Sequence, residues 1–391
     1  MTTTATGLES ASAVRAVTAG VHWSVYAVLF ASTSVLVGVL WDISWHQTIG
    51  RDSFWTPAHL AIYLGGVVAG LACGWTALRI TFAGTASERA ESVRFWGFRA
   101  PLGAWVCIWG TIMMITSAPF DNWWHNAYGL DVKILSPPHM VLAAGMIGIQ
   151  VGAMLMVLGA QNRTEREDGG RRYAYIFAFA AAIVLVMSSV VIQEEAAFGN
   201  SMHGSSFYKM TGIVFPLFLA AFGRALRLKW PATTVALLYM AIVLVTMWVT
   251  QLFPAQAKLA PIYNPVTHMV PTPFPLLLVF PALAIDLVMR RFGEKNDWML
   301  SVVIGVAFVA VMIAVHWYWA EFLLSPYARN FVFGVDKWDY STRLGPWRYE
   351  YWNLDRGGFL LFRGLAVAAV YATISARLGL WWGAGMSRIK R

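Results

Sequence analysis

Charged residues are scarce in this chain, and their scarcity excludes an ordinary soluble domain. Asp, Glu, Lys and Arg make up 13% of the 391 residues, whereas a soluble domain carries about a quarter. Hydrophobic residues make up 58%, and the mean hydropathy is +0.57. This composition indicates a membrane protein.

Cysteine is nearly absent, with Cys73 and Cys107 the only two, and both lie inside apolar runs. This count argues against a disulfide framework and against a thiolate metal cluster. The first twenty residues lack the charged-then-apolar order of a cleaved signal peptide, so we expect a short cytoplasmic tail.

Long apolar runs are the main feature that the sequence does have. About twenty apolar residues span a hydrocarbon core of roughly 30 Å, and helices satisfy the backbone there. The runs predict an all-α fold, a polytopic integral membrane helical bundle with about ten transmembrane helices. The expected spans are 21–42, 57–79, 101–120, 138–160, 173–193, 210–228, 231–252, 273–290, 298–320 and 359–382.

The distribution of Lys and Arg predicts the orientation. Of 29 basic residues, 19 fall in the tails and loops on one side of these spans and 10 on the other. The positive-inside rule then places both termini in the cytoplasm of a cell that carries the protein in its plasma membrane. The net charge of +9 is explained by these loops, so we expect no nucleic acid partner.

Two short stretches on the predicted outer face are repeats of one pattern. WDISWHQTIGRDSFWTPAHL begins at Trp41, and FDNWWHNAYGLDVKILSPPHMVL begins at Phe120. Each combines a helix end, a short loop and a helix start. The matched positions are Asp42 and Asp121, Trp45 and Trp124, His46 and His125, Gly50 and Gly129, Asp52 and Asp131, Thr56 and Ser136, and His59 and His139.

The spacing within each repeat predicts a metal site. Asp42 and His46 are four residues apart, so they share one face of a helix. Thr56 is a suitable N-cap with Pro57 behind it, which puts His59 in the first turn of the returning helix. We therefore expect Asp42, His46 and His59 to meet, with Arg51 and Asp52 supporting them or forming an ion pair.

The second repeat predicts the same arrangement of Asp121, His125 and His139. One carboxylate and two imidazoles suit copper, zinc or non-haem iron, and copper(II) binds most strongly in the divalent series. Such a set leaves a coordination position open for water or oxygen.

At these residues the sequence resembles the C subunit of copper membrane monooxygenases, the particulate methane and ammonia monooxygenases. DISWHQTIGRDSFWTPAH carries the resemblance, which covers about residues 25–160. It implies that Asp42, His46 and His59 bind copper and are the catalytic residues. The family's second site has Asn where this chain has Asp121, followed by histidines that match His125 and His139.

The resemblance divides the chain into two predicted parts. Residues 1–160 hold the metal-binding hairpins, and 161–391 add further transmembrane helices with an outer cap loop at about 321–358. Four other outer residues leave a further site open: Glu194, Glu195, His203 and His268.

Two functions remain open at this point. The first is O2-dependent hydroxylation of a small apolar substrate by a copper monooxygenase or one of its subunits. That reaction implies partner subunits and a quinol or protein electron donor. The alternative is a membrane protein that stores copper or delivers it during assembly of another enzyme, without catalysis.

Overall fold

The structure is a computed structural model that describes residues 22–128, 136–164, 167–195, 204–293, 296–351, 355 and 358–390. Within this part the chain is almost entirely helical, with one small antiparallel hairpin, β1 (Val93–Phe95) and β2 (Phe98–Ala100). The helices are α1 (Trp23–Thr48), α2 (Pro57–Ala83), α3 (Ala86–Ala90), α4 (Leu102–Tyr128), α5 (Pro137–Arg163), α6 (Glu167–Glu195), α7 (Ser205–Ala225), α8 (Pro231–Thr250), α9 (Val279–Phe292), α10 (Asp297–Leu324) and α11 (Gly358–Met386).

Nine of the described helices are long and apolar enough to cross a membrane. They are α1, α2, α4, α5, α6, α7, α8, α10 and α11. The all-α multi-pass bundle is therefore confirmed. The eighth expected span, 273–290, differs, because its helix α9 has only 14 residues, or about 21 Å. The expected N-terminal tail lies outside the described residues.

An extended segment, residues 269–278, occupies the place of the missing helical turns. It contains Pro271, Pro273 and Pro275, and a proline inside a helix breaks a hydrogen bond of the ladder. Backbone without helical hydrogen bonds is tolerated at membrane depth only where protein surrounds it. Accordingly Val270, Leu276 and Leu278 are each at most 4% exposed.

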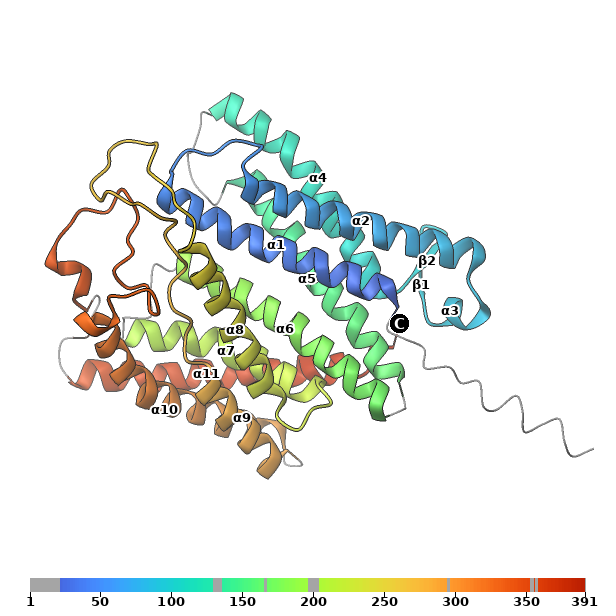
Figure 1. Cartoon of the computed structure of the whole chain (residues 1–391). Helices are drawn as coiled ribbons and strands as arrows, with labels where there is room; N and C mark the ends of the chain where they lie inside the picture. Colours follow the sequence, from blue (N-terminus) through green and yellow to red (C-terminus); the bar gives the residue numbers. More distant parts are fainter. Residues whose placement is uncertain are drawn as a thin grey trace, which may run out of the picture.

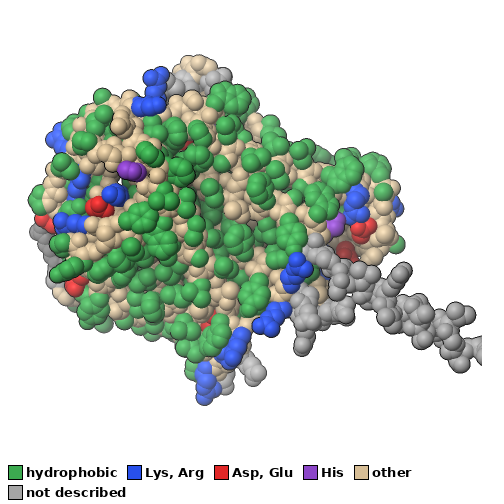
Figure 2. Space-filling model, viewed as in Figure 1, with side chains coloured by type: hydrophobic (Ala, Val, Ile, Leu, Met, Phe, Trp, Pro, Cys, Tyr) green, Lys and Arg blue, Asp and Glu red, His purple; other side chains and the backbone are tan. Residues whose placement is uncertain are grey.

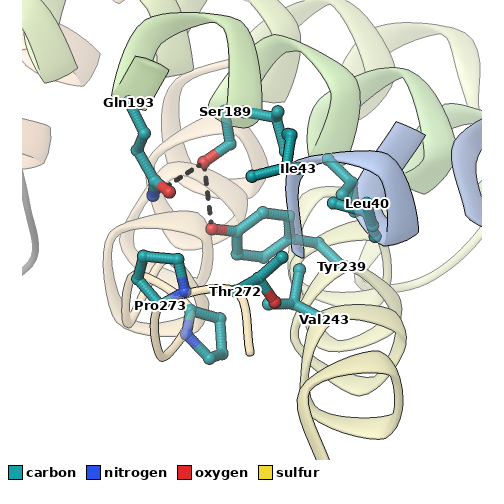
Figure 3. A pocket seen from close by; sticks show the side chains of 11 residues that line it. Leu40, Ile43, Ser189, Gln193, Tyr239, Val243, Thr272 and Pro273 are labelled. Carbon is teal, nitrogen blue, oxygen red and sulfur yellow. Dashed lines mark hydrogen bonds between the residues drawn. The ribbon is translucent and has the colours of Figure 1, made fainter. Parts of the chain in front are cut away.

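Side chains of α1 and α8 satisfy the backbone of this extended segment. Thr48 Oγ1 accepts a hydrogen bond from Val270 N at 2.7 Å, and Ser44 Oγ donates to Val270 O at 2.5 Å. The Tyr239 hydroxyl accepts from Leu276 N at 3.3 Å and lies 3.2 Å from Ser189 Oγ (Figure 3). We call this extended segment together with α9 the broken span. Its backbone is therefore held at the end of α1 by hydrogen bonds.

The helices form two groups that share one core. The helices α1, α2, α4 and α5 pack on each other in the upper part of Figure 1, and α7, α9, α10 and α11 in the lower part, with α6 and α8 between them. At Gly110 the backbones of α4 and α5 are so close that a Cβ would lie 2.7 Å from Gly145 O.

Two loops form a cap over one end of the bundle, at the left of Figure 1. The cap consists of residues 251–268 and 325–351, and we call this the cap end. The cap is joined to α1 by hydrogen bonds from Tyr340 N to Gln47 O at 3.0 Å and from Lys258 N to Ile49 O at 2.9 Å. These carbonyls end α1 and have no partner within it, so the cap completes the helix.

Basic residues gather in the loops at the opposite end, which we call the basic end. These loops follow α2, α7 and α11 and carry Arg89, Arg94, Arg99, Arg227, Lys229, Arg388 and Lys390. They are among the basic residues that the sequence analysis assigned to the cytoplasmic side.

The flanks of the bundle are apolar, as contact with lipid requires. On α2, the side chains of one stripe, three or four residues apart, are 47–74% exposed although all are large and hydrophobic. They are Leu64, Val67, Leu71, Trp75, Leu78 and Phe82. Figure 2 shows hydrophobic side chains over much of the face in view. Exposed apolar area of this extent marks a surface that water does not cover, so a lipid membrane is the fitting environment.

Replacing Thr48 by Val tests the attachment of the broken span to α1. Thr48 is fully buried and the change keeps its shape, but Val270 N then loses its acceptor. We expect a loss of about 1–3 kcal/mol in the free energy of unfolding, measured by thermal denaturation in detergent. Thr116→Val is the control, because that exposed hydroxyl bonds only to its own helix. Equal stability of both variants would contradict the attachment.

Candidate metal centre

The loop between α1 and α2 turns sharply and is fixed by its own hydrogen bonds. Gly50 takes a φ of +80°, a conformation that favours glycine. Trp45 Nε1 donates to Arg51 O at 3.0 Å. Thr56 stands at the N-cap of α2, but its hydroxyl accepts from Ser53 N at 2.8 Å rather than from the helix. The predicted helix start is confirmed, and the predicted capping bond is replaced by one within the loop.

Asp42, His46 and His59 meet at the mouth of this hairpin. Nε2 of His59 lies 3.1 Å from Asp42 Oδ1, and Nε2 of His46 lies 3.9 Å from Asp42 Oδ2. One ligand atom from each of the three lies within 4.8 Å of the other two. Ligand atoms that share an ion with bonds of about 2.1 Å are separated by roughly 3.0–3.4 Å, so small side-chain movements would seat one ion.

The hydrogen bonds of His59 identify the atom that faces Asp42. Nδ1 lies 2.9 Å from the carbonyl oxygen of Ser53, and because a carbonyl only accepts, Nδ1 carries a proton. In the neutral ring Nε2 is then unprotonated and directs its lone pair at Asp42 Oδ1. That oxygen is buried and accepts no hydrogen bond. Two lone pairs at 3.1 Å need a cation between them.

This arrangement is typical of metal-binding histidines, which donate their other N–H to a carbonyl or carboxylate. The alternative cation is a proton, which would make His59 an imidazolium paired with Asp42. The side chain of His59 is 19% exposed and that of His46 49%. The donor set therefore fits a transition metal ion, with one side open to a further ligand.

Asp52 also lies beside this cluster, which is one of the two roles that the sequence analysis left open for it. Its Oδ2 lies 3.5 Å from His46 Nε2 and 3.6 Å from His59 Nε2. Within the described residues, no ion pair joins Asp52 to Arg51, so the expected pair between these neighbours is not formed. The repeat contained a signal for this role, because Asp131 stands at the equivalent position.

The second hairpin reproduces the geometry of the first in the part that the structure describes. Nε2 of His139 lies 3.4 Å from Asp121 Oδ1, and α5 begins at Pro137 after Ser136 as α2 begins at Pro57 after Thr56. The side chain of His125 and the loop with Gly129 and Asp131 lie outside the described residues.

The two hairpins are neighbours in space, with Tyr63 beside both. Tyr63 lies one turn after His59 on α2, and its ring centroid is 6.2 Å from that of His59. The helix α2, which carries both His59 and Tyr63, packs against α4, which carries Asp121. The repeat in the sequence therefore corresponds to two adjacent acidic clusters at the cap end.

The other candidate residues are placed apart from this centre or are not described. His268 is exposed, and its Nδ1 lies 3.1 Å from Thr267 Oγ1. His203 and the side chains of Glu194 and Glu195 lie outside the described residues, so the further site that they left open stays untested.

A small pocket lies behind α1 and is separate from the metal centre. Leu40 and Ile43 line it from α1, and neither Asp42 nor His46 is among its lining residues. Its polar lining comes from Ser189, Gln193, Tyr239 and Thr272 (Figure 3). These residues lie on α6, α8 and the extended segment, so no local sequence signal could have revealed the pocket.

Comparison with known proteins adds no family to this description. No protein-family model matches the chain, and neither a curated protein nor a solved structure matches it. The fold and the cluster define its class: a multi-pass helical protein of membrane type, with an Asp–His cluster that can bind a metal ion.

Replacing Gly50 by Ala tests whether the loop and the cap position the cluster. A Cβ there would lie within 2.8 Å of three Tyr340 ring and hydroxyl atoms, and φ is +80°. We expect weaker metal binding, by about tenfold or more, and a lower unfolding temperature.

Gly97→Ala is the matched control for this substitution. Gly97 has a φ of +85° but an added Cβ would meet no atom within 4 Å, so it carries the same backbone strain without the clash. If both variants bind metal like the unchanged protein, the cap does not position the ligands.

Proposed function

We propose that this protein is a membrane metalloprotein whose first centre consists of Asp42, His46 and His59. The observation that carries the proposal is that Nε2 of His59 faces a buried Asp42 oxygen while its Nδ1 faces the carbonyl oxygen of Ser53. A buried carboxylate oxygen that accepts no hydrogen bond is costly unless a cation compensates it, and only Oδ1 of Asp42 is buried in this way, since its side chain is 24% exposed. A metal ion satisfies both atoms and also draws in His46.

We infer that the ion is copper and that it serves O2-dependent hydroxylation of a small apolar substrate. The support is the resemblance of residues 25–160 to the C subunit of copper membrane monooxygenases, together with the donor set. When bound, copper would supply the binding of O2 and the transfer of electrons. The three side chains hold the ion, and the partly exposed His46 leaves room for a small ligand beside it.

The exposed aromatic side chains of the hairpin favour an apolar substrate. Phe54 and Trp55 are 51% and 71% exposed, and Phe54 packs on Tyr63 at 5.0 Å between ring centroids. Hydroxylation requires two electrons from outside the chain, so the proposal includes a quinol or protein donor and partner subunits. With the basic end in the cytoplasm, the centre lies on the outer face of the plasma membrane.

The second hairpin is proposed as a second copper centre, formed by Asp121, His125 and His139. Its support is the repeat and the distance of 3.4 Å between His139 and Asp121. Asp121 stands where the family has Asn, and the added charge favours a divalent ion.

Metal analysis of purified variants tests the first centre. The triple variant Asp42→Ala, His46→Ala, His59→Ala should lose one equivalent of copper, measured by mass spectrometry of the metal and by electron paramagnetic resonance. His59→Ala alone should weaken binding by at least tenfold, because ligand removal exceeds the effect of outer partners. In the unchanged protein, metal at 100 times its Kd should add about 2.7 kcal/mol of stability.

The control for this experiment is His268→Ala, which removes an exposed imidazole at the same end of the bundle. Its metal content should equal that of the unchanged protein. Full retention of copper by the triple variant would refute the first centre.

The alternative function, copper storage or delivery, is favoured by the 49% exposure of the His46 side chain. An accessible ligand suits the transfer of an ion to another protein. The two functions separate in one assay on copper-loaded protein given a reduced quinol, O2 and a short alkane. Formation of the alcohol supports catalysis, whereas no alcohol and rapid release of copper to a chelator support delivery.

A further inference from the structure

We propose that Asp52 is a fourth ligand of the first centre and that it makes the centre selective for a divalent ion. This inference rests on the proposed function, because it concerns the same ion. It departs from the three-residue set that the resemblance implies, and it assigns a role to a loop residue.

Asp52 is almost equally distant from the two imidazoles, whereas Asp42 is nearer to one of them than to the other. Asp52 Oδ2 lies 3.5 Å and 3.6 Å from the Nε2 atoms of His46 and His59, whereas the corresponding distances for Asp42 are 3.9 Å and 3.1 Å. Separations of roughly 3.0–3.4 Å are expected around one ion. By this criterion a carboxylate that contacts both imidazoles is as well placed to bind as the predicted ligand.

The environment of Asp52 contains no competing cation among the described residues. Among the described residues, Asp52 forms ion pairs with His46 and His59 and none with Arg51, its neighbour in the chain. The carboxylate therefore contacts the two imidazoles of the cluster. Asp52 lies in the loop before α2, and its side chain is 36% exposed, so it can move the short distance that coordination requires.

The charge of the cluster follows from this assignment. Two carboxylates and two neutral imidazoles carry a charge of −2, which a divalent ion neutralises and a monovalent ion does not. Hard oxygen ligands also favour divalent ions over copper(I), which prefers soft ligands. Asp52 should therefore stabilise Cu(II) or Zn(II) much more than Cu(I).

The experiment titrates purified protein with Cu(II), Zn(II) and, without oxygen, Cu(I), each against a competing chelator. His139→Ala is used as the background, so that only the first centre is measured. In that background, Asp52→Asn should lower the affinity for Cu(II) and Zn(II) at least tenfold and that for Cu(I) less than threefold. Asp52→Glu keeps a carboxylate and should restore most of the divalent affinity.

Asp336→Asn is the matched control. It removes the same charge from a side chain of similar exposure, 33%, that pairs with Lys337 in the cap, and it should leave all three affinities unchanged. Thermal denaturation of each variant without metal checks that the fold is intact.

The outcomes separate the inference from the proposed function. If Asp52→Asn binds Cu(II) and Zn(II) as before while His59→Ala does not, Asp52 is no ligand and the first centre stands. If Asp52→Asn weakens all three ions equally, the selectivity is wrong. If the background protein itself binds no ion, the proposed function fails together with the inference.

Discussion

The hydrogen bond between Ser53 O and His59 Nδ1 is the constraint on which the candidate centre depends. Because a carbonyl only accepts, this bond puts a proton on Nδ1, and it turns Nε2 towards two carboxylates. Without it, the imidazole could rotate and donate to Asp42, and the cluster would be an ordinary His–Asp pair. Because Ser53 also bonds to Thr56, the same loop that starts α2 also orients its first histidine.

The rest of the bundle supports this geometry by holding the end of α1. Asp42 and His46 occupy the last two turns of that helix, where the final carbonyls have no partner within it. The cap supplies Tyr340 N and Lys258 N, and the broken span exchanges two hydrogen bonds with Ser44 and Thr48. A non-helical crossing segment and a folded cap are costly in a membrane protein, and here both stabilise the helix end that presents the ligands.

Patterns within one or two neighbouring helices were readable from the sequence. Apolar runs predicted the bundle, and the spacing of Asp42, His46 and His59 predicted that they meet, because a helix turn and an antiparallel hairpin fix their relation. The start of the eighth span was predicted too early. The prolines before α9 are apolar, so their segment has the composition of a transmembrane helix although it is extended. The sequence left open whether Asp52 supports the ligands or pairs with Arg51, because a loop residue has no fixed periodicity and its orientation depends on the turn at Gly50.

The contacts of α1 have a consequence for biosynthesis. All three ligands of the predicted set emerge from the ribosome by His59, yet the residues that secure their helix come about 200 to 280 positions later, at Lys258, Val270 and Tyr340. An ion captured early would meet an unsecured hairpin. During translation, the three side chains of the candidate centre are therefore present long before these hydrogen bonds to the end of α1 can form.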